Sequence, residues 1–256
     1  MQKSNRRTGA DPIIMIDGTE DDMDKLRKEL SSLKVDAILD IATRDGGFAK
    51  EMLLGLGGCR KAVALDISDK MFDKGREKCA GLPVEFVVGD ACAMNFPDNS
   101  FDIVAVANSL HHIPDLEALF REMRRVVKPD GLLLISEMYS DGQPKASLTH
   151  WILHDLDCDM HTLDGIYHHP TYSKGQILWM VKNAGLTVEK TLCDLVDDPK
   201  VLSKLKERVA AVPGNLKKYE GRSEYAAMAA KAAWLQQEYD AEGVMSAEQL
   251  VVFARK

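Results

Sequence analysis

Several features that define large classes of protein are missing from this sequence. No stretch approaches the roughly 18 consecutive apolar residues of a membrane-spanning helix, and no apolar run of a signal peptide follows the basic N-terminal residues. The five cysteines are odd in number and form no CxxC pair, so we expect free thiols rather than a disulfide framework. These absences predict a cytoplasmic protein.

Positive charge is also in short supply. The 256 residues include 33 Lys and Arg against 40 Asp and Glu, which gives a formal net charge of −7. That balance argues against nucleic acid or an anionic membrane as the main partner. The contents of 45% hydrophobic and 29% charged residues are ordinary for a globular chain and exclude a collagen-like or mostly disordered protein.

Short apolar runs alternate with amphipathic helical segments in the first half of the chain. The helical segments lie near residues 46–55, 69–80 and 115–127. The runs are Ala37–Ile41, Ala62–Leu65, Val84–Val88, Ile103–Ala107 and Leu132–Ser136. They are continuously apolar, as strands covered on both faces of a sheet should be. The alternation predicts an α/β fold with a mostly parallel sheet between two layers of helices.

The second half of the chain has a different pattern. Helices are expected over 144–165 and 174–184, and strands over 187–192 and 249–254. Residues 199–240 are rich in Ala, Lys and Glu and are expected to form two helices broken near Pro213 and Gly214. An earlier helix is expected to start after Thr19, which has the character of an N-cap.

The first apolar run is followed by a turn of small and polar residues that opens into a helix. The turn runs Thr43-Arg44-Asp45-Gly46-Gly47, and such a turn lets backbone N–H groups approach a ligand at the helix N-terminus. The dinucleotide pattern G-x-G-x-x-G is not met, because its three positions are Ala42, Arg44 and Gly47. A nicotinamide-dependent oxidoreductase is therefore disfavoured, and a plain turn without a ligand is a further interpretation.

Polar residues stand where four successive strands are predicted to end. These residues are Asp40, Asp66, Asp90 and Asn108. Each of them alone could be a helix cap or a turn former. The carboxyl edge of an open α/β sheet is where ligands bind, and an acid after the second strand can accept both hydroxyls of a ribose. Four such residues at one edge therefore predict a ligand site.

Five motifs in this region carry a family resemblance. They are LDIATRDGG, ALDISDKM, VGDACAMNFPDNSFDIV, ANSLHHI and FREMRRVVKPDGLLLISE. With them, the stretch from about 36 to 137 resembles class I S-adenosylmethionine-dependent methyltransferases, especially the ubiquinone/menaquinone-biosynthesis type and its small-molecule relatives. The resemblance implies a Rossmann-like, seven-stranded, mostly parallel sheet whose last strand is antiparallel.

The resemblance also implies a role for each residue at the strand ends. Asp40 would anchor the loop that faces the methionine part of S-adenosylmethionine, and Asn108 would lie under that part near the transferred methyl group. Asp66 would hold the ribose, and Asp90 would accept the adenine amino group. The other implied cofactor residues are Ala42, Arg44 and Gly46 in the loop, Ile67 and Met71 beside the adenosine, and Ala91 beside the adenine.

Arg44 departs from the family pattern, which usually has glycine there. Its Cβ could force the turn into another shape if the position needs a positive φ. Alternatively, its guanidinium could bind the cofactor carboxylate. The departure also keeps open a non-catalytic or regulatory protein that binds S-adenosylmethionine.

The function that the resemblance implies is methyl transfer by in-line displacement. The fourth strand continues as Asn108-Ser109-Leu110-His111, not as the Asn-Pro-Pro-aromatic pattern of enzymes that methylate base amines of nucleic acids. Together with the acidic charge, this favours a small-molecule acceptor. We expect a loose leader over 1–18 and a single domain over 19–256, with a cofactor core over 34–140, helical segments over 141–172 and 195–245 that cover the acceptor, and a last core strand over 248–255. Apolar helix faces within 199–240 could pack on the sheet or on a second subunit, so a homo-oligomer is a further expectation.

Five of the seven histidines lie between residues 150 and 169. On a helix, His154, Asp157 and His161 lie on one face. Neighbouring pairs could share a divalent metal with His168 or His169 from the next loop, and the metal would orient an oxygen-bearing acceptor. The predicted ligands are His154, Asp157, His161 and His169. The alternative is a polar face that lines the acceptor pocket or is simply solvated.

Histidines are also the candidates for a general base. We select His111, which follows the fourth predicted strand, and His154 and His161 on the later helix. A structural role in the turn after the strand is the alternative for His111 and its neighbour His112.

Overall fold

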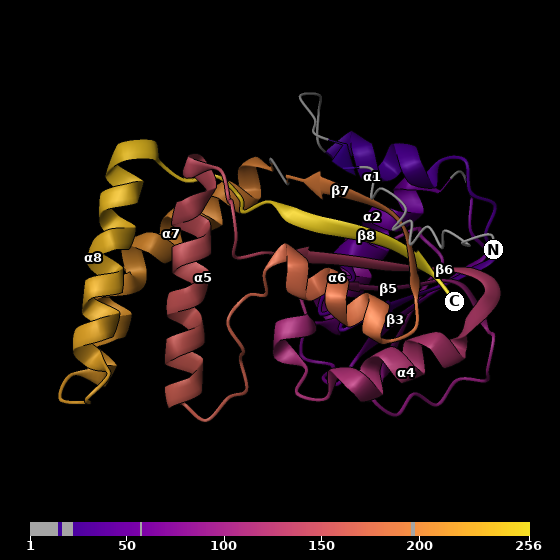
Figure 1. The fold of residues 1–256 in the computed structure, drawn as a ribbon, viewed down its shortest axis with the longest axis horizontal. Coiled ribbons are helices and arrows are strands. Elements are labelled where there is room, and N and C mark those ends of the chain that lie inside the picture. Colours follow the sequence, from indigo (N-terminus) through magenta and orange to yellow (C-terminus); the bar gives the residue numbers. More distant parts are fainter. Residues whose placement is uncertain (1–14, 17–22, 57, 196–197) are drawn as a thin grey trace, which may run out of the picture.

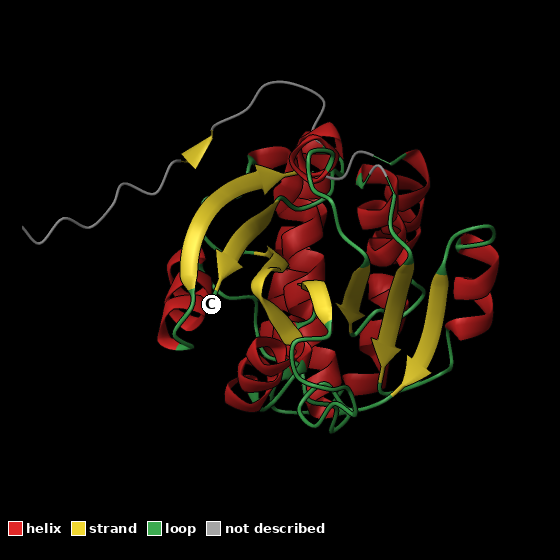
Figure 2. Ribbon diagram, turned by 90° about the vertical axis from the view of Figure 1, so that its right-hand side faces the viewer, coloured by secondary structure: helices red, strands yellow, loops and turns green. Residues whose placement is uncertain are grey.

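The computed structural model describes residues 15–16, 23–56, 58–195 and 198–256, which form a sheet with helices on both faces (Figures 1 and 2). The strands are β1 (Met15–Ile16), β2 (Ala37–Ile41), β3 (Lys61–Asp66), β4 (Val84–Val88), β5 (Phe101–Ala107), β6 (Val127–Met138), β7 (Thr187–Asp194) and β8 (Gln249–Arg255). Their order across the sheet is β1-β7-β8-β6-β5-β2-β3-β4. The seven predicted strands are all present.

Strand direction follows the expected pattern. The neighbours β6, β5, β2, β3 and β4 run parallel, and β8 lies antiparallel between β6 and β7. The predicted antiparallel last strand is therefore confirmed. The two-residue strand β1 adds an eighth member beside β7, within the segment expected to be a loose leader. The remainder of that segment, and the cap predicted at Thr19, lie outside the described residues.

Helices cover both faces of the sheet. They are α1 (Met23–Leu30), α2 (Gly47–Gly55), α3 (Phe72–Lys78), α4 (Leu116–Val126), α5 (Lys145–Leu163), α6 (Lys174–Asn183), α7 (Pro199–Leu216) and α8 (Tyr225–Glu242), with the short 3₁₀ helices η1 (Leu110–His112) and η2 (Lys217–Tyr219). Apolar side chains of α1 and α2 pack on one face, and those of α4 and α6 pack on the other. None of the helices in the described part of the chain is long and apolar enough to cross a membrane.

One of the five early strands is less buried than its sequence predicts. Strand β4 forms the edge of the sheet, where Glu85 is exposed and Val88 keeps 58% of its surface accessible. The expectation that every apolar run is covered on both faces is wrong for β4, because an edge strand has a neighbour on one side only. The other four strands have buried centres.

Helices α5, α7 and α8 stand side by side beyond the end of the sheet and share a core of their own (Figure 1). This core includes Leu156 of α5, Leu205 and Val209 of α7, and Leu235 of α8. The predicted break near Pro213 is wrong, since α7 continues through that residue to Leu216. Pro213 lacks the N–H that would bond to the carbonyl four residues earlier, but only three residues of the helix follow it.

The separate core predicts a stability effect. Leu156 is fully buried between the three helices, so Leu156→Ala is expected to lower the free energy of unfolding by about 2–5 kcal/mol through lost burial and a cavity. The matched control is Leu54→Ala, because Leu54 is 50% exposed and its truncation is expected to change stability by less than about 0.5 kcal/mol. Urea denaturation measures both, and equal effects of the two substitutions would contradict the prediction.

Candidate functional site

The loop between β2 and α2 has an unusual backbone. Ala42 and Arg44 have φ angles of 54°, and Gly46 has a φ of 70°. A positive φ costs a residue with a side chain roughly 1–2 kcal/mol. The turn therefore keeps an alternating left-handed shape even where Arg44 replaces the expected glycine. The expectation that a Cβ at this position could force another shape is not met.

Two carboxylates hold this loop. Buried Asp40 accepts hydrogen bonds from the Thr43 hydroxyl at 2.5 Å and from the Ala49 backbone N–H at 3.0 Å. Asp66 accepts the Arg44 backbone N–H at 2.8 Å, at the position where the backbone is strained. Desolvation raises the pKa of Asp40 to about 7, and the charges of Asp66 and Asp45 act in the same direction. Neighbouring strand ends are thus tied together through the loop.

A cavity of about 280 Å³ opens beside the loop, at the carboxyl ends of β2, β5 and β6. Its lining includes Asp40, Ala42, Arg44, Asn108, Ser136 and Gln249. The structure therefore brings together the loop and two of the predicted strand-end residues. A larger groove of about 900 Å³ lies between α4 and α6 and shares no residue with this cavity.

The next two strand ends form an open shelf beside the loop. The backbone N–H of Gly89 donates to the Asp66 carbonyl at 2.9 Å, which places Asp66 and Asp90 on adjacent strand ends. Ile67 is 74% exposed, an unusual state for a large apolar residue. Asp90 accepts the Cys92 backbone N–H at 2.8 Å, and each carboxylate can accept further hydrogen bonds. An exposed apolar side chain such as Ile67, close in sequence to Asp66 and on the strand end next to Asp90, suits a flat ring that carries polar groups at its edge.

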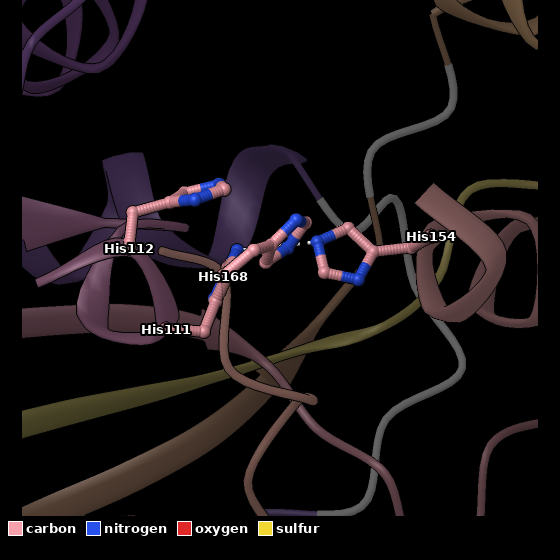
Figure 3. A group of neighbouring side chains, drawn as sticks. All are labelled: His111, His112, His154 and His168. Atoms are coloured by element: carbon pink, nitrogen blue, oxygen red, sulfur yellow. Dashed lines mark hydrogen bonds between the residues drawn. The ribbon is translucent and has the colours of Figure 1, made fainter. Parts of the chain in front are cut away.

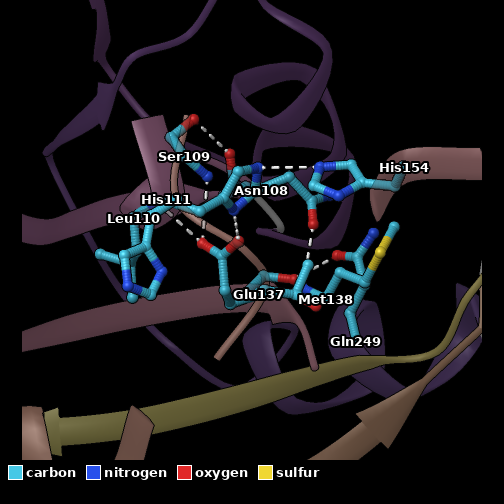
Figure 4. Close-up of polar contacts among 12 residues, drawn as sticks. Asn108, Ser109, Leu110, His111, Glu137, Met138, His154 and Gln249 are labelled. Atoms are coloured by element: carbon cyan, nitrogen blue, oxygen red, sulfur yellow. Dashed lines mark hydrogen bonds and ion pairs between the residues drawn. The ribbon is translucent and has the colours of Figure 1, made fainter. Parts of the chain in front are cut away.

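Asn108 is placed by the strand that follows it. It has a φ of 46°, and its side-chain oxygen accepts the Met138 backbone N–H at 3.1 Å (Figure 4). Ser136 donates to Gln249 at 2.6 Å, which links β6 to β8 below the cavity. These contacts give the cavity a polar floor.

Glu137 lies at the end of β6, is fully buried, and binds the turn after β5. One of its oxygens accepts the backbone N–H groups of Ser109 and Leu110, each at 3.0 Å (Figure 4). The other lies 2.5 Å from Nδ1 of His111. A carboxylate accepts, so Nδ1 of His111 donates to Glu137 and Nε2 is the ring nitrogen left for another partner.

Three more histidine rings surround His111. Its Nε2 lies 3.1 Å from Nε2 of His154 on α5, and the ring of His168 stacks against it at 5.3 Å between centroids (Figure 3). The ring of His112 lies 4.3 Å from those of both His111 and His168. Desolvation lowers the pKa of His154 to about 2, that of His112 to about 3 and that of His168 to about 4.

The predicted histidine face of α5 is divided by the structure. His154 lies in the cluster, whereas His161 contacts it from behind, with its Nδ1 2.9 Å from Nδ1 of His168. Asp157 forms an ion pair with Arg208, and the ring of His169 stacks on Tyr172. Of the four predicted metal ligands, His154 alone therefore lies in the cluster.

The sequence predicted neither the role of Glu137 nor the meeting of His111 and His112 with His154, although it offered His168 as one of two loop ligands. The available signals were the adjacent histidines after the fourth strand and the acid that directly follows the apolar run of the fifth. Neither signal predicts that the turn after β5 and the end of β6 lie next to α5.

Comparisons with known proteins agree with this geometry. Residues 39–135 match the family model described as a methyltransferase domain. The ubiquinone/menaquinone biosynthesis C-methyltransferase UbiE of Hahella chejuensis is 37% identical over 115 residues, which are 43% of this chain and 46% of that protein. The chain thus aligns with less than half the length of this curated relative.

Solved structures extend the likeness over most of the fold. Protein BH2331 of Bacillus halodurans superposes with a TM-score of 0.61 and 23% identity, covering 92% of this chain and 98% of that one. The phosphoethanolamine N-methyltransferase 2 of Haemonchus contortus, solved with S-adenosylhomocysteine, gives a TM-score of 0.54 and 20% identity, covering 91% and 51%. At these identities the likeness concerns the fold alone. The left-handed loop and the strand-end carboxylates lie inside residues 39–135, the segment that matches the methyltransferase domain.

Proposed function

We propose that the protein transfers a methyl group from S-adenosylmethionine to a small-molecule acceptor at the carboxyl edge of its sheet. The observation that carries the proposal is the loop after β2, which keeps positive φ angles at Ala42, Arg44 and Gly46 although two of these residues have side chains. Strain of this kind persists where the surrounding structure enforces it, and here Asp40 and Asp66 do so. The positive φ of Arg44 supports cofactor binding at this loop. The alternative of a non-catalytic protein that binds S-adenosylmethionine is tested by the release of S-adenosylhomocysteine.

The proposed cofactor site extends along the strand ends. Asp66 would bind the ribose, with Ile67 and Met71 against the adenosine, and the exposed apolar surface of Ile67 supports this role. Asp90 and the backbone N–H of Ala91 would contact the adenine. The methionine part would occupy the cavity lined by the loop and Asn108. S-adenosylmethionine supplies the electrophilic methyl group when bound.

The chain's own contribution to the reaction is alignment. In-line displacement depends on holding the reacting atoms in place and on excluding water. Helices α5, α7 and α8 pack beyond the strand ends and would cover the acceptor, while the buried contacts of Glu137 fix the turn that carries His111. His111 and His154 each present Nε2 toward the other, so either is placed to hold a proton of the acceptor. His161 lies behind His168 and is a poorer candidate for the base.

The acceptor is proposed only as a small molecule, not nucleic acid. The matched segment ends at residue 135, so the helices that would contact the acceptor lie outside it. The relatives' quinone substrates therefore do not transfer to this chain.

The activity is tested with a metabolite extract and S-adenosylmethionine. Release of S-adenosylhomocysteine, together with an acceptor whose mass rises by one methylene group, would support the proposal. Calorimetry with S-adenosylhomocysteine and with NAD forms a parallel test, and binding of NAD alone would contradict it.

The ribose assignment predicts the effect of Asp66→Ala. Loss of hydrogen bonds to a charged group is expected to weaken S-adenosylhomocysteine binding by about 1.5–3 kcal/mol, or roughly 10- to 150-fold. Asp73→Ala is the control, because Asp73 is an exposed acid of α3 paired with Arg76. Calorimetry on both folded variants decides the matter, and unchanged affinity of the Asp66 variant would overturn the assignment.

The strained backbone predicts a gain in stability for Arg44→Gly. Glycine adopts the φ of 54° without a clash, so the free energy of unfolding is expected to rise by about 1 kcal/mol after its greater chain entropy is subtracted. Arg44→Ala retains the Cβ and is expected to show no such gain. If the guanidinium binds the cofactor carboxylate, both variants lose S-adenosylhomocysteine affinity equally, by about tenfold or more.

The raised pKa of Asp40 predicts a dependence of stability on pH. The unfolded carboxyl has a pKa of 3.8 and the folded one a pKa of about 7, so the folded state binds the extra proton between these values. Stability from this group is full below about pH 4 and falls as the pH rises to about 7. Asp40→Asn is expected to flatten that fall, which urea denaturation across this range measures. Asp73→Asn serves as the control, and parallel profiles for the wild type and the Asp40 variant would rule the prediction out.

A further inference from the structure

Four histidines from three separate segments meet at one point beside the proposed acceptor site. His111 and His112 come from η1, His154 from α5, and His168 from the loop after α5 (Figure 3). One ring nitrogen from each lies within 4.8 Å of the corresponding nitrogens of the others. His111 and His168 are buried, His154 is partly buried, and His112 is exposed. The cluster therefore has a closed side and an open side.

Hydrogen bonds among the described residues do not satisfy these rings. Nδ1 of His168 is occupied by His161, but its Nε2 is buried and has no partner. Nδ1 of His154 is also buried and unpartnered. A buried polar atom without a partner is unfavourable, so the free Nε2 of His168 favours a ligand at this point of the cluster.

The surroundings of the cluster are those of a metal site. Glu137 binds Nδ1 of His111 and directs Nε2 inward, the arrangement in which a carboxylate orients a metal-binding imidazole. Nδ1 of His168 lies 2.9 Å from Nδ1 of His161, which leaves Nε2 of His168 for an ion. In a tetrahedral zinc site two ligand nitrogens stand about 3.4 Å apart, close to the 3.1 Å between Nε2 of His111 and Nε2 of His154.

The donor set restricts the kind of ion. All four ligands are imidazole nitrogens, which suit zinc, ferrous iron and similar divalent transition metals. Magnesium and calcium prefer oxygen ligands, and the cluster presents none.

We infer that His111, His154 and His168 bind a divalent transition-metal ion, with His112 as an exchangeable fourth ligand on the open side. The turn that carries His111 begins at Asn108, which lines the proposed cofactor cavity. An oxygen atom of the acceptor that replaced His112 would be held near that cavity. The binding of the ion stands independently of the proposed function, and only its use in orienting the acceptor rests on methyl transfer. An ion bound at Nε2 of His111 and His154 takes up the lone pairs that would hold the acceptor's proton, so with the ion bound neither histidine is the base.

The experiment uses full-length protein purified without a histidine tag and stripped of metal with a chelator. Titration with Zn²⁺ against an indicator, and with Co²⁺ by visible absorption, is expected to show about one equivalent bound in a site of nitrogen ligands. Zn²⁺ is also expected to raise the melting temperature of the stripped protein, since it binds the folded state.

Single substitutions locate the site. His154→Gln and His168→Gln are each expected to weaken Zn²⁺ binding at least about 100-fold, and Glu137→Gln about 10- to 100-fold. His112→Ala is expected to stay within about tenfold, because three ligands remain. His169→Gln is the matched control, since His169 is an exposed neighbour outside the cluster, and it is expected to bind as the wild type does. Circular dichroism of the stripped variants checks that they fold.

Three results would overturn the inference. These are wild-type protein that binds less than about a tenth of an equivalent, unchanged affinity in folded His154 and His168 variants, or equal loss in the His169 control. S-adenosylhomocysteine binding is measured on the same samples. Failure of metal binding with intact S-adenosylhomocysteine binding rejects the metal site alone, whereas the reverse result rejects the proposed function alone.

Discussion

The buried carboxylate of Glu137 is the contact on which the rest of the site depends. It ends β6 and gathers two backbone N–H groups and one imidazole nitrogen from the turn after β5. A fully buried acid is expensive to desolvate unless its oxygens are hydrogen-bonded, and here both oxygens are. These contacts fix the turn that joins Asn108, in the lining of the proposed cofactor cavity, to His111 in the histidine cluster.

The loop after β2 uses the same device at a second place. Its left-handed backbone is unfavourable for Ala42 and Arg44, and Asp40 and Asp66 stabilise it by accepting hydrogen bonds from Thr43, Ala49 and the Arg44 amide. Strand-end acids thus have two tasks in this fold. They shape the backbone through some of their lone pairs, and in the proposed function Asp66 uses others for the ribose.

The family match covers one part of the site and not the other. The matched residues 39–135 hold the loop, the shelf and the first two histidines. The helices α5, α7 and α8 have their own core and bring the remaining histidines from outside that segment. The proposed cofactor site therefore lies mainly in the matched segment, whereas the helices proposed to cover the acceptor lie outside it.

The sequence by itself determined the strands, most helices and the edge at which the acids gather. These features depend on local hydrophobic periodicity and on motifs a few residues long, which is why β2 and β4 begin and end at the predicted residues. Where context mattered, the prediction failed: β4 became a half-exposed edge, and α7 continued through Pro213.

Only the tertiary structure decided which histidines meet. His111 and His154 are 43 residues apart, and the rotation of α5 that brings them together is set by its packing on α7 and α8. The same packing lets Asp157 form an ion pair with Arg208 on α7. The ring of His169 stacks on Tyr172 instead of joining the cluster. Helical spacing places side chains on a common face, but it contains no information about what that face touches. The direction of α5 against the sheet, and with it the composition of the cluster, follows from burial of apolar surface between segments far apart in the chain.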